Sequence, residues 1–163
     1  MTREEQLVKI DRMRYTKDKL SANLILAAIV LDALYFISIY KTDVGTYYYT
    51  WVIGASIVYN LLFLLTAFLA SEGVKSRRGS YTGLLMFIGL MQFVRVFYLP
   101  AKAHAAVVNI NNVDIRVMTD GQYLFTVICL VLSGACCIVA AITSFKNRKT
   151  LSDYMRSLQN DAV

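Results

Sequence analysis

Few of the residue types that build catalytic and metal sites are present in this chain. Its 163 residues include one histidine and three cysteines, and the cysteines lack the C-x-x-C spacing of zinc or thiol redox sites. It has neither a glycine-rich phosphate loop nor a G-x-S-x-G motif. The single histidine, His104, has no Cys, Asp or Glu at ligand spacing, and we interpret it as a solvated loop residue. We therefore predict that the protein is not an enzyme and holds no metal and no cofactor.

Charged residues are also scarce, and long apolar runs take their place. Only 17% of the residues are charged whereas 57% are hydrophobic, a composition too apolar for an ordinary soluble domain. The apolar residues form four blocks, each close to the roughly 20 residues that cross a bilayer as an α-helix. The predicted fold class is all-α, an integral membrane four-helix bundle. Its membrane helices are predicted at residues 20–40, 49–71, 81–99 and 123–145.

Positive charge is distributed unevenly along the chain. Of the 17 Lys and Arg residues, 13 fall in residues 1–19, 71–78 and 146–156, while the two other loops hold three. Lysine and arginine concentrate on the cytoplasmic side of membrane proteins, so we predict that both termini lie in the cytoplasm. The basic patches are expected to contact anionic lipid headgroups there, and no nucleic-acid partner is predicted.

Amphipathic segments are predicted at both ends of the bundle. Residues 1–19 should form a helix along the cytoplasmic membrane surface, with or without a docking role. Residues 146–163 should contain a separate helix that Thr150 caps and whose apolar residues recur on one face. We expect that face to dock onto the membrane or a partner protein.

The connection after the third helix is harder to assign. The only proline, Pro100, is predicted to end that helix. In the outer loop that follows, residues 101–122, the first part can continue as a helix. Alternating apolar residues at 113–117 suggest a strand, which would be marginal in isolation.

Two groups of residues are predicted to anchor and pack the helices. An aromatic belt at the membrane interface is predicted beside the second helix. It consists of Tyr47, Tyr48, Tyr49 and Trp51. Small residues recur every four positions in the fourth helix and form a seam where another helix can approach closely. They are Cys129, Ser133, Cys137 and Ala141.

Four polar residues interrupt the apolar runs of the first three helices. They are Asp32, Asn60, Gln92 and Arg95. At about 1.5 Å per helical residue, all four lie roughly 17–21 Å from the inner ends of their helices. Gln92 and Arg95 also share one helix face. We therefore predict an intramembrane polar network around an Asp32–Arg95 ion pair.

Three interpretations of this network remain open. Its contacts can hold the helices together and fix their register. Arg95 can instead extend to the outer headgroups, because it lies about five residues from Pro100. In the third interpretation the network is a pathway for an ion, a proton or a small solute, with Asp32 as the titratable group.

Three stretches of the chain resemble a known group of proteins. They are MRYTKDKLSANL (residues 13–24), DVGTYYYT (43–50) and IVYNLLF (57–63). They are similar to a group of small four-helix bacterial membrane proteins, some of which are labelled as carotene oxygenases. The resemblance covers about the first half of the chain, implies the bacterial cytoplasmic membrane and brings no functional residues. An oxygenase of that kind needs several histidines for its iron, whereas this chain has one.

These observations favour a small non-enzymatic integral membrane protein that is an accessory or structural subunit of a larger membrane assembly, such as a transporter. The expected partners are the lipid bilayer and either another membrane protein or a second copy of the chain. The alternative is a self-sufficient transporter or channel for a small solute, proton or ion that works through Asp32.

Overall fold

The computed structural model describes residues 4–5, 7–9, 18–41, 50–75, 79–110 and 113–160. Four long helices and one hairpin account for nearly all of them. In chain order they are α2 (Lys19–Tyr40), α4 (Thr50–Lys75), α5 (Gly79–Ala105), β1 (Val107–Ile110), β2 (Val113–Arg116) and α6 (Asp120–Asn160). Each of the four helices is long and apolar enough to cross a membrane. This confirms the prediction of a helical chain with four segments of membrane-spanning length.

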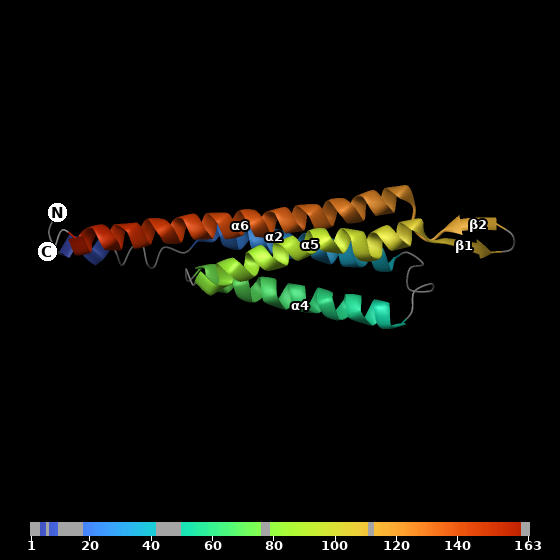
Figure 1. Ribbon diagram of the computed structural model, residues 1–163, viewed down its shortest axis with the longest axis horizontal. Helices are drawn as coiled ribbons and strands as arrows, with labels where there is room; N and C mark the ends of the chain where they lie inside the picture. Colours follow the sequence, from blue (N-terminus) through green and yellow to red (C-terminus); the bar gives the residue numbers. More distant parts are fainter. Residues whose placement is uncertain are drawn as a thin grey trace.

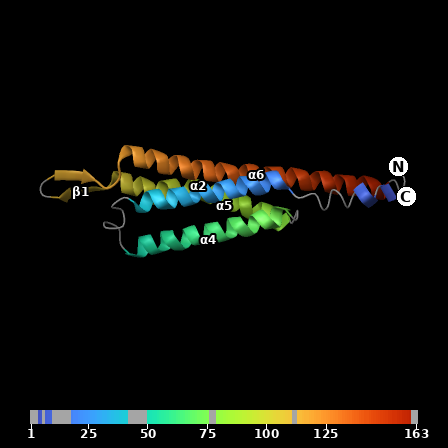
Figure 2. The ribbon, with the colours of Figure 1, turned by 180° about the vertical axis from the view of Figure 1, so that it is seen from behind.

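The helices lie side by side along one long axis (Figure 1). α6 packs most extensively against α5 and α2, and α4 completes the ring by contacting α2 and α5. We call the end where α2 begins the terminal end, and the end that carries β1 and β2 the hairpin end. Toward the hairpin end α4 diverges from the other three helices (Figures 1 and 2).

Two apolar core clusters fill the bundle. The cluster nearer the terminal end takes buried residues from all four helices, among them Ile25, Phe63, Leu85 and Ala140. The cluster nearer the hairpin end is built by α2, α5, α6 and the segment after β2, and among the described residues α4 contributes none. Four helices therefore form the core at the terminal end, whereas three helices and the segment after β2 form it at the hairpin end.

Glycine allows α5 and α6 to approach closely near the middle of the bundle. A Cβ atom at Gly134 would lie 2.9 Å from the Gly89 carbonyl oxygen and 2.9 Å from the Phe93 ring. The small residues of the predicted seam are all buried on this side of α6. They are Cys129, Ser133, Cys137 and Ala141.

The predicted end of the third helix at Pro100 is wrong, because α5 continues through it to Ala105. Proline removes one backbone hydrogen bond and costs about 3 kcal/mol inside a helix. The following turn offsets this cost by packing, since Ala103 is fully buried in the hairpin-end cluster against Val117 and Met118. His104 consequently lies in the last turn of α5 and not in a loop.

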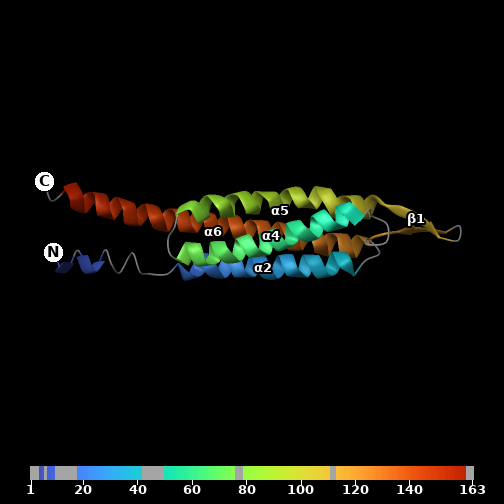
Figure 3. The same cartoon turned by 90° about the horizontal axis from the view of Figure 1, so that it is seen from below.

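A separate helix after residue 146 is also wrong. α6 runs for 41 residues without a break, and the Thr150 hydroxyl donates to the Lys146 carbonyl oxygen at 3.1 Å instead of capping a new helix. Residues 146–150 contain neither glycine nor proline, so nothing in them ends the helix. The C-terminal part of α6 therefore projects beyond the bundle at the terminal end (Figure 3).

The loop between α5 and α6 contains a β-hairpin, in a region where the sequence suggested only one marginal strand. β1 and β2 pair antiparallel from Val107 opposite Arg116 to Ile110 opposite Val113. An isolated pair of strands is marginal in water, but this one is fixed at its base, where the Val117 N–H donates to the Ala106 carbonyl oxygen at 3.1 Å. Val117 and Met118 then enter the core.

Two predicted regions are described only in part. Tyr47, Tyr48 and Tyr49 lie outside the described residues, whereas Trp51 is 89% exposed in the first turn of α4. Of the predicted segment 1–19, residues 4–5 and 7–9 are helical and exposed.

Candidate functional site: a buried polar layer

A layer of polar side chains separates the two apolar core clusters. α2 supplies Asp32, α4 supplies Asn60, α5 supplies Gln92 and Arg95, and α6 supplies Ser133. All five are buried, and Asp32, Gln92 and Ser133 have no exposed surface. Apolar residues of the core clusters lie on both sides of the layer: on α5, Ile88 belongs to the terminal-end cluster and Val96 to the hairpin-end cluster.

Arg95 and Asp32 form an ion pair across the layer. Arg95 Nη1 lies 2.7 Å from Asp32 Oδ1. The two side chains come from α2 and α5, which face each other across the bundle and make little direct contact. The long arginine side chain therefore fills a space that an apolar residue of ordinary length would leave open.

Two amides extend the ion pair into a network. The Gln92 amide nitrogen donates to Asp32 Oδ1 at 2.9 Å and to Ser133 Oγ at 3.4 Å, and its oxygen accepts from Arg95 at 3.0 Å. Arg95 Nη2 donates to Asn60 Oδ1 at 2.7 Å. The Ser133 hydroxyl in turn donates to the Ala28 carbonyl oxygen at 3.0 Å. The network thus joins all four helices at one level.

Two tyrosine rings lie against the guanidinium group. The centre of the Arg95 guanidinium is 4.5 Å from the Tyr35 ring centroid and 4.6 Å from that of Tyr59. Such cation–π contacts are worth about 2 kcal/mol or more when the cation is desolvated. The two rings therefore stabilise the positive charge in addition to the carboxylate and the amides.

Hydrogen bonds are unevenly distributed over the ion pair. Asp32 Oδ2 is buried and has no hydrogen-bond partner within the described ranges. Of the five N–H donors of a guanidinium, three are used by Asp32, Gln92 and Asn60. The Tyr35 side chain, whose ring lies against the guanidinium, also forms a hydrogen-bonding interaction with Arg95.

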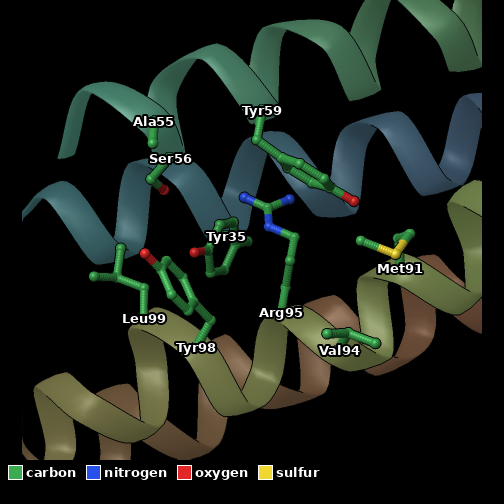
Figure 4. A pocket seen from close by; sticks show the side chains of 9 residues that line it. All are labelled: Tyr35, Ala55, Ser56, Tyr59, Met91, Val94, Arg95, Tyr98 and Leu99. Atoms are coloured by element: carbon green, nitrogen blue, oxygen red, sulfur yellow. The ribbon is translucent and has the colours of Figure 1, made fainter. Parts of the chain in front are cut away.

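A pocket of about 340 Å³ opens beside Arg95 toward the hairpin end. It occupies the region where α4 diverges from the other helices, and Figure 4 shows the guanidinium extending into it. The lining comes from α2, α4 and α5 and is mostly apolar or aromatic. Its residues are Tyr35, Ala55, Ser56, Tyr59, Met91, Val94, Arg95, Tyr98 and Leu99. Asp32 is not among them, so the arginine separates the carboxylate from the pocket.

The described residues contain no group of three or more His, Cys, Asp or Glu side chains that could hold a metal. All three cysteines are free and lie on α6. His104 pairs with Asp120 at 2.8 Å and stacks on Tyr123 at 4.4 Å, at the base of the hairpin and far along α5 from the polar layer.

The sequence pattern identifies four of these residues but misses three. Asp32, Asn60, Gln92 and Arg95 come together in the structure. Tyr35 could have been included, because it lies one helical turn from Asp32. Ser133 was predicted only as part of the packing seam, although its hydroxyl also takes part in the polar network. No pattern in the sequence predicts that Tyr59 contacts Arg95.

The Asp18 carboxylate makes structural contacts outside the polar layer. It caps α2 by accepting from the Ser21 N–H at 3.2 Å, and it accepts from the Asn147 amide at 3.1 Å. An Asp directly before an apolar run is a typical helix-start signal.

No family model, no curated protein and no solved structure matches this chain.

Proposed function

We propose that this chain is a small non-enzymatic integral membrane protein that acts as an accessory or structural subunit of a larger membrane assembly. The observation that carries the proposal is the length of α6. Its 41 residues extend about 60 Å at 1.5 Å per residue, whereas the next longest helix has 27 residues. The excess projects beyond the bundle (Figure 1).

The C-terminal part of α6 is mostly exposed and positively charged, although Arg148 lies against Gly79 at the start of α5 and Leu151 is buried. Lys146, Arg148, Lys149 and Arg156 are exposed on it. Among the described residues its contact from the N-terminal segment is Lys9, whose ammonium lies 4.8 Å from the Tyr154 ring centroid. Leu7 and Val8 of that segment are 55% and 66% exposed. A short helical projection gains most of its stability from packing, so a partner with an acidic surface suits it.

The polar layer supports a structural role for the membrane part. Asp32 has no exposed surface and does not line the pocket beside Arg95, and its hydrogen bonds join α2 to α5. Polar contacts of this kind hold transmembrane helices in register. In this proposal the bundle anchors the protein, and the α6 projection contacts the partner.

The proposed orientation follows from the basic residues. With the positive-inside distribution, both termini and the α6 projection lie in the cytoplasm, and the hairpin lies outside. The proposed location is the bacterial cytoplasmic membrane, with the basic patches near anionic headgroups.

Site-specific photocrosslinking in native membranes tests this function. A photoreactive residue at Ser152, exposed on the projection, should give one discrete crosslinked protein. The same residue at Val139, exposed on the apolar surface of the bundle, should give lipid adducts only. Lipid adducts from both positions, together with a strictly monomeric protein in mild detergent, would contradict the proposal.

The alternative function is a proton, ion or small-solute transporter that works through Asp32. The observation that favours it is the unpartnered Asp32 Oδ2 in the bundle interior, because an intramembrane carboxyl without a full set of partners is typical of proton relays. Flux into reconstituted vesicles tests it. A flux abolished by Asp32→Asn supports a transporter, and a flux equal in both proteins excludes Asp32 as the carrier group.

A further inference from the structure

The pocket beside Arg95 combines features that the structural role of the polar layer does not require. It has about 340 Å³ of free volume, within the range of roughly 300–1,000 Å³ typical of small-molecule sites. The Arg95 guanidinium extends into it near the hydroxyls of Tyr35, Tyr98 and Ser56, and the arginine side chain is nine-tenths buried. Hydrogen-bond donors gathered in a largely buried site favour a ligand that supplies an acceptor.

The charge of the site selects an uncharged ligand. Asp32 already balances Arg95 at 2.7 Å. An anionic ligand would add a second negative charge within a few ångströms, in surroundings of low dielectric constant where an unbalanced charge is costly. A carbonyl oxygen accepts hydrogen bonds without adding charge, so it suits the donors that line the pocket.

The depth of the site excludes the ester groups of ordinary glycerolipids. Gln92 is the middle residue of α5, and Arg95 lies three residues farther along, about 5 Å from the helix midpoint. Ester groups lie near the edge of a hydrocarbon core that is about 30 Å thick, roughly 15 Å from its centre. The carbonyl that reaches Arg95 must therefore belong to a molecule that enters the hydrocarbon core.

The shape of the lining favours a flat ring. Three of the lining residues are tyrosines, namely Tyr35, Tyr59 and Tyr98, and Figure 4 shows the Tyr98 and Tyr35 hydroxyls with that of Ser56 on one side of Arg95. Aromatic side chains pack well against planar rings. Val94 and Tyr98 are also about half exposed on the apolar surface of α5, so the pocket opens toward lipid.

We propose that this pocket binds the ring of a lipid-soluble quinone. A ring carbonyl oxygen accepts a hydrogen bond from the Arg95 guanidinium, and the alkyl tail leaves between α4 and α5 into the lipid. The ring carries no charge and is small enough for the pocket. The proposal concerns binding only and is independent of any protein partner at the α6 projection.

Calorimetric titration of the purified protein in detergent micelles tests the ligand class. The probe is 2-decyl-1,4-benzoquinone. Decylbenzene has the same tail and a ring without carbonyls, and decanoate has a similar tail with a negative charge. We expect saturable binding of the quinone, with both comparison compounds weaker by about tenfold or more, the loss expected for one hydrogen bond from a charged donor.

Two variants on α4 test the location. Ser56→Phe fills the pocket without touching the polar layer and should weaken quinone binding by about tenfold or more. Val58→Phe is the control, because Val58 is exposed on α4 and does not line the pocket. It should leave the affinity within about twofold of the original, since its side chain faces lipid.

Four results would each overturn the proposal. They are no saturable quinone binding by the unmodified protein, equal affinity for decylbenzene, unchanged affinity in Ser56→Phe, and displacement of the quinone by dioctanoylglycerol at equal concentration. The last result would assign the pocket to a glycerolipid carbonyl.

Discussion

Replacing Asp32 by Asn removes the negative charge of the polar layer and keeps the size of the side chain. Arg95 then stays buried with its charge unbalanced, since a guanidinium cannot lose its proton in a protein. The ion pair at 2.7 Å has no described neighbour that could replace the carboxylate. Breaking a buried pair by removing one partner costs about 3–5 kcal/mol, so Asp32→Asn should lower the free energy of unfolding by that amount.

Replacing Arg95 by Gln should lower the free energy of unfolding less than replacing Asp32 by Asn. In Arg95→Gln the buried Asp32 carboxyl can bind a proton and become neutral, so we expect a loss near 3 kcal/mol, at the low end of about 3–5 kcal/mol. The double variant Asp32→Asn/Arg95→Gln contains no buried charge. Its loss should fall below the sum of the two single losses by about 2 kcal/mol or more, within the range found for contacting residues.

Unfolding in mixed micelles of mild detergent and sodium dodecyl sulfate, followed by far-ultraviolet circular dichroism, measures these free energies. Losses that add within about 0.5 kcal/mol would refute the ion pair, since independent sites add. A smaller loss for Asp32→Asn than for Arg95→Gln would refute the charge argument.

Three further predictions concern the fold. Gly134→Ala should destabilise the bundle by about 1–3 kcal/mol by overpacking the α5–α6 crossing, while Gly83→Ala, whose added methyl meets nothing within 4 Å, should stabilise α5 slightly; the same unfolding assay compares them. Asp18→Ala should cost about 1 kcal/mol as a lost N-cap, and Asn147→Ala, which removes only the α6 contact to Asp18, should cost less. Lys149→Pro should lower the helical content and cost about 3 kcal/mol if α6 is continuous, whereas a loop at residues 146–149 would tolerate it as well as Lys149→Ala.

The features predicted correctly from the sequence are those with one dominant physical cause. Apolar runs of membrane-spanning length admit few structures other than helices, so the four helices follow from composition and length. The burial cost of a charge explains why Arg95 and Asp32 could be paired from their depths alone. The small residues of α6 also lie where close packing requires them.

The features that the sequence did not predict depend on packing between distant segments, which no local sequence pattern reports. Proline usually ends a helix, yet α5 continues through Pro100, and Ala103 in its last turn belongs to the same buried cluster as Met118, which follows the hairpin. From the sequence, one continuous helix past Lys146 could not be distinguished from two helices joined by a turn. Both arrangements give the same periodicity of apolar residues. The pocket exists because α4 diverges from the other helices at the hairpin end. The hydrophobic pattern of the sequence does not predict such a divergence.

The buried polar layer and the pocket both depend on the position of the Arg95 guanidinium, which solid-state nuclear magnetic resonance in lipid bilayers measures. The side-chain nitrogens of Arg95 should show a strong dipolar coupling to the carboxyl carbon of Asp32, as the 2.7 Å contact requires. They should show none to lipid phosphorus. A coupling to phosphorus without one to Asp32 would place Arg95 at the headgroups, and it would contradict both the buried polar layer and the pocket built on it.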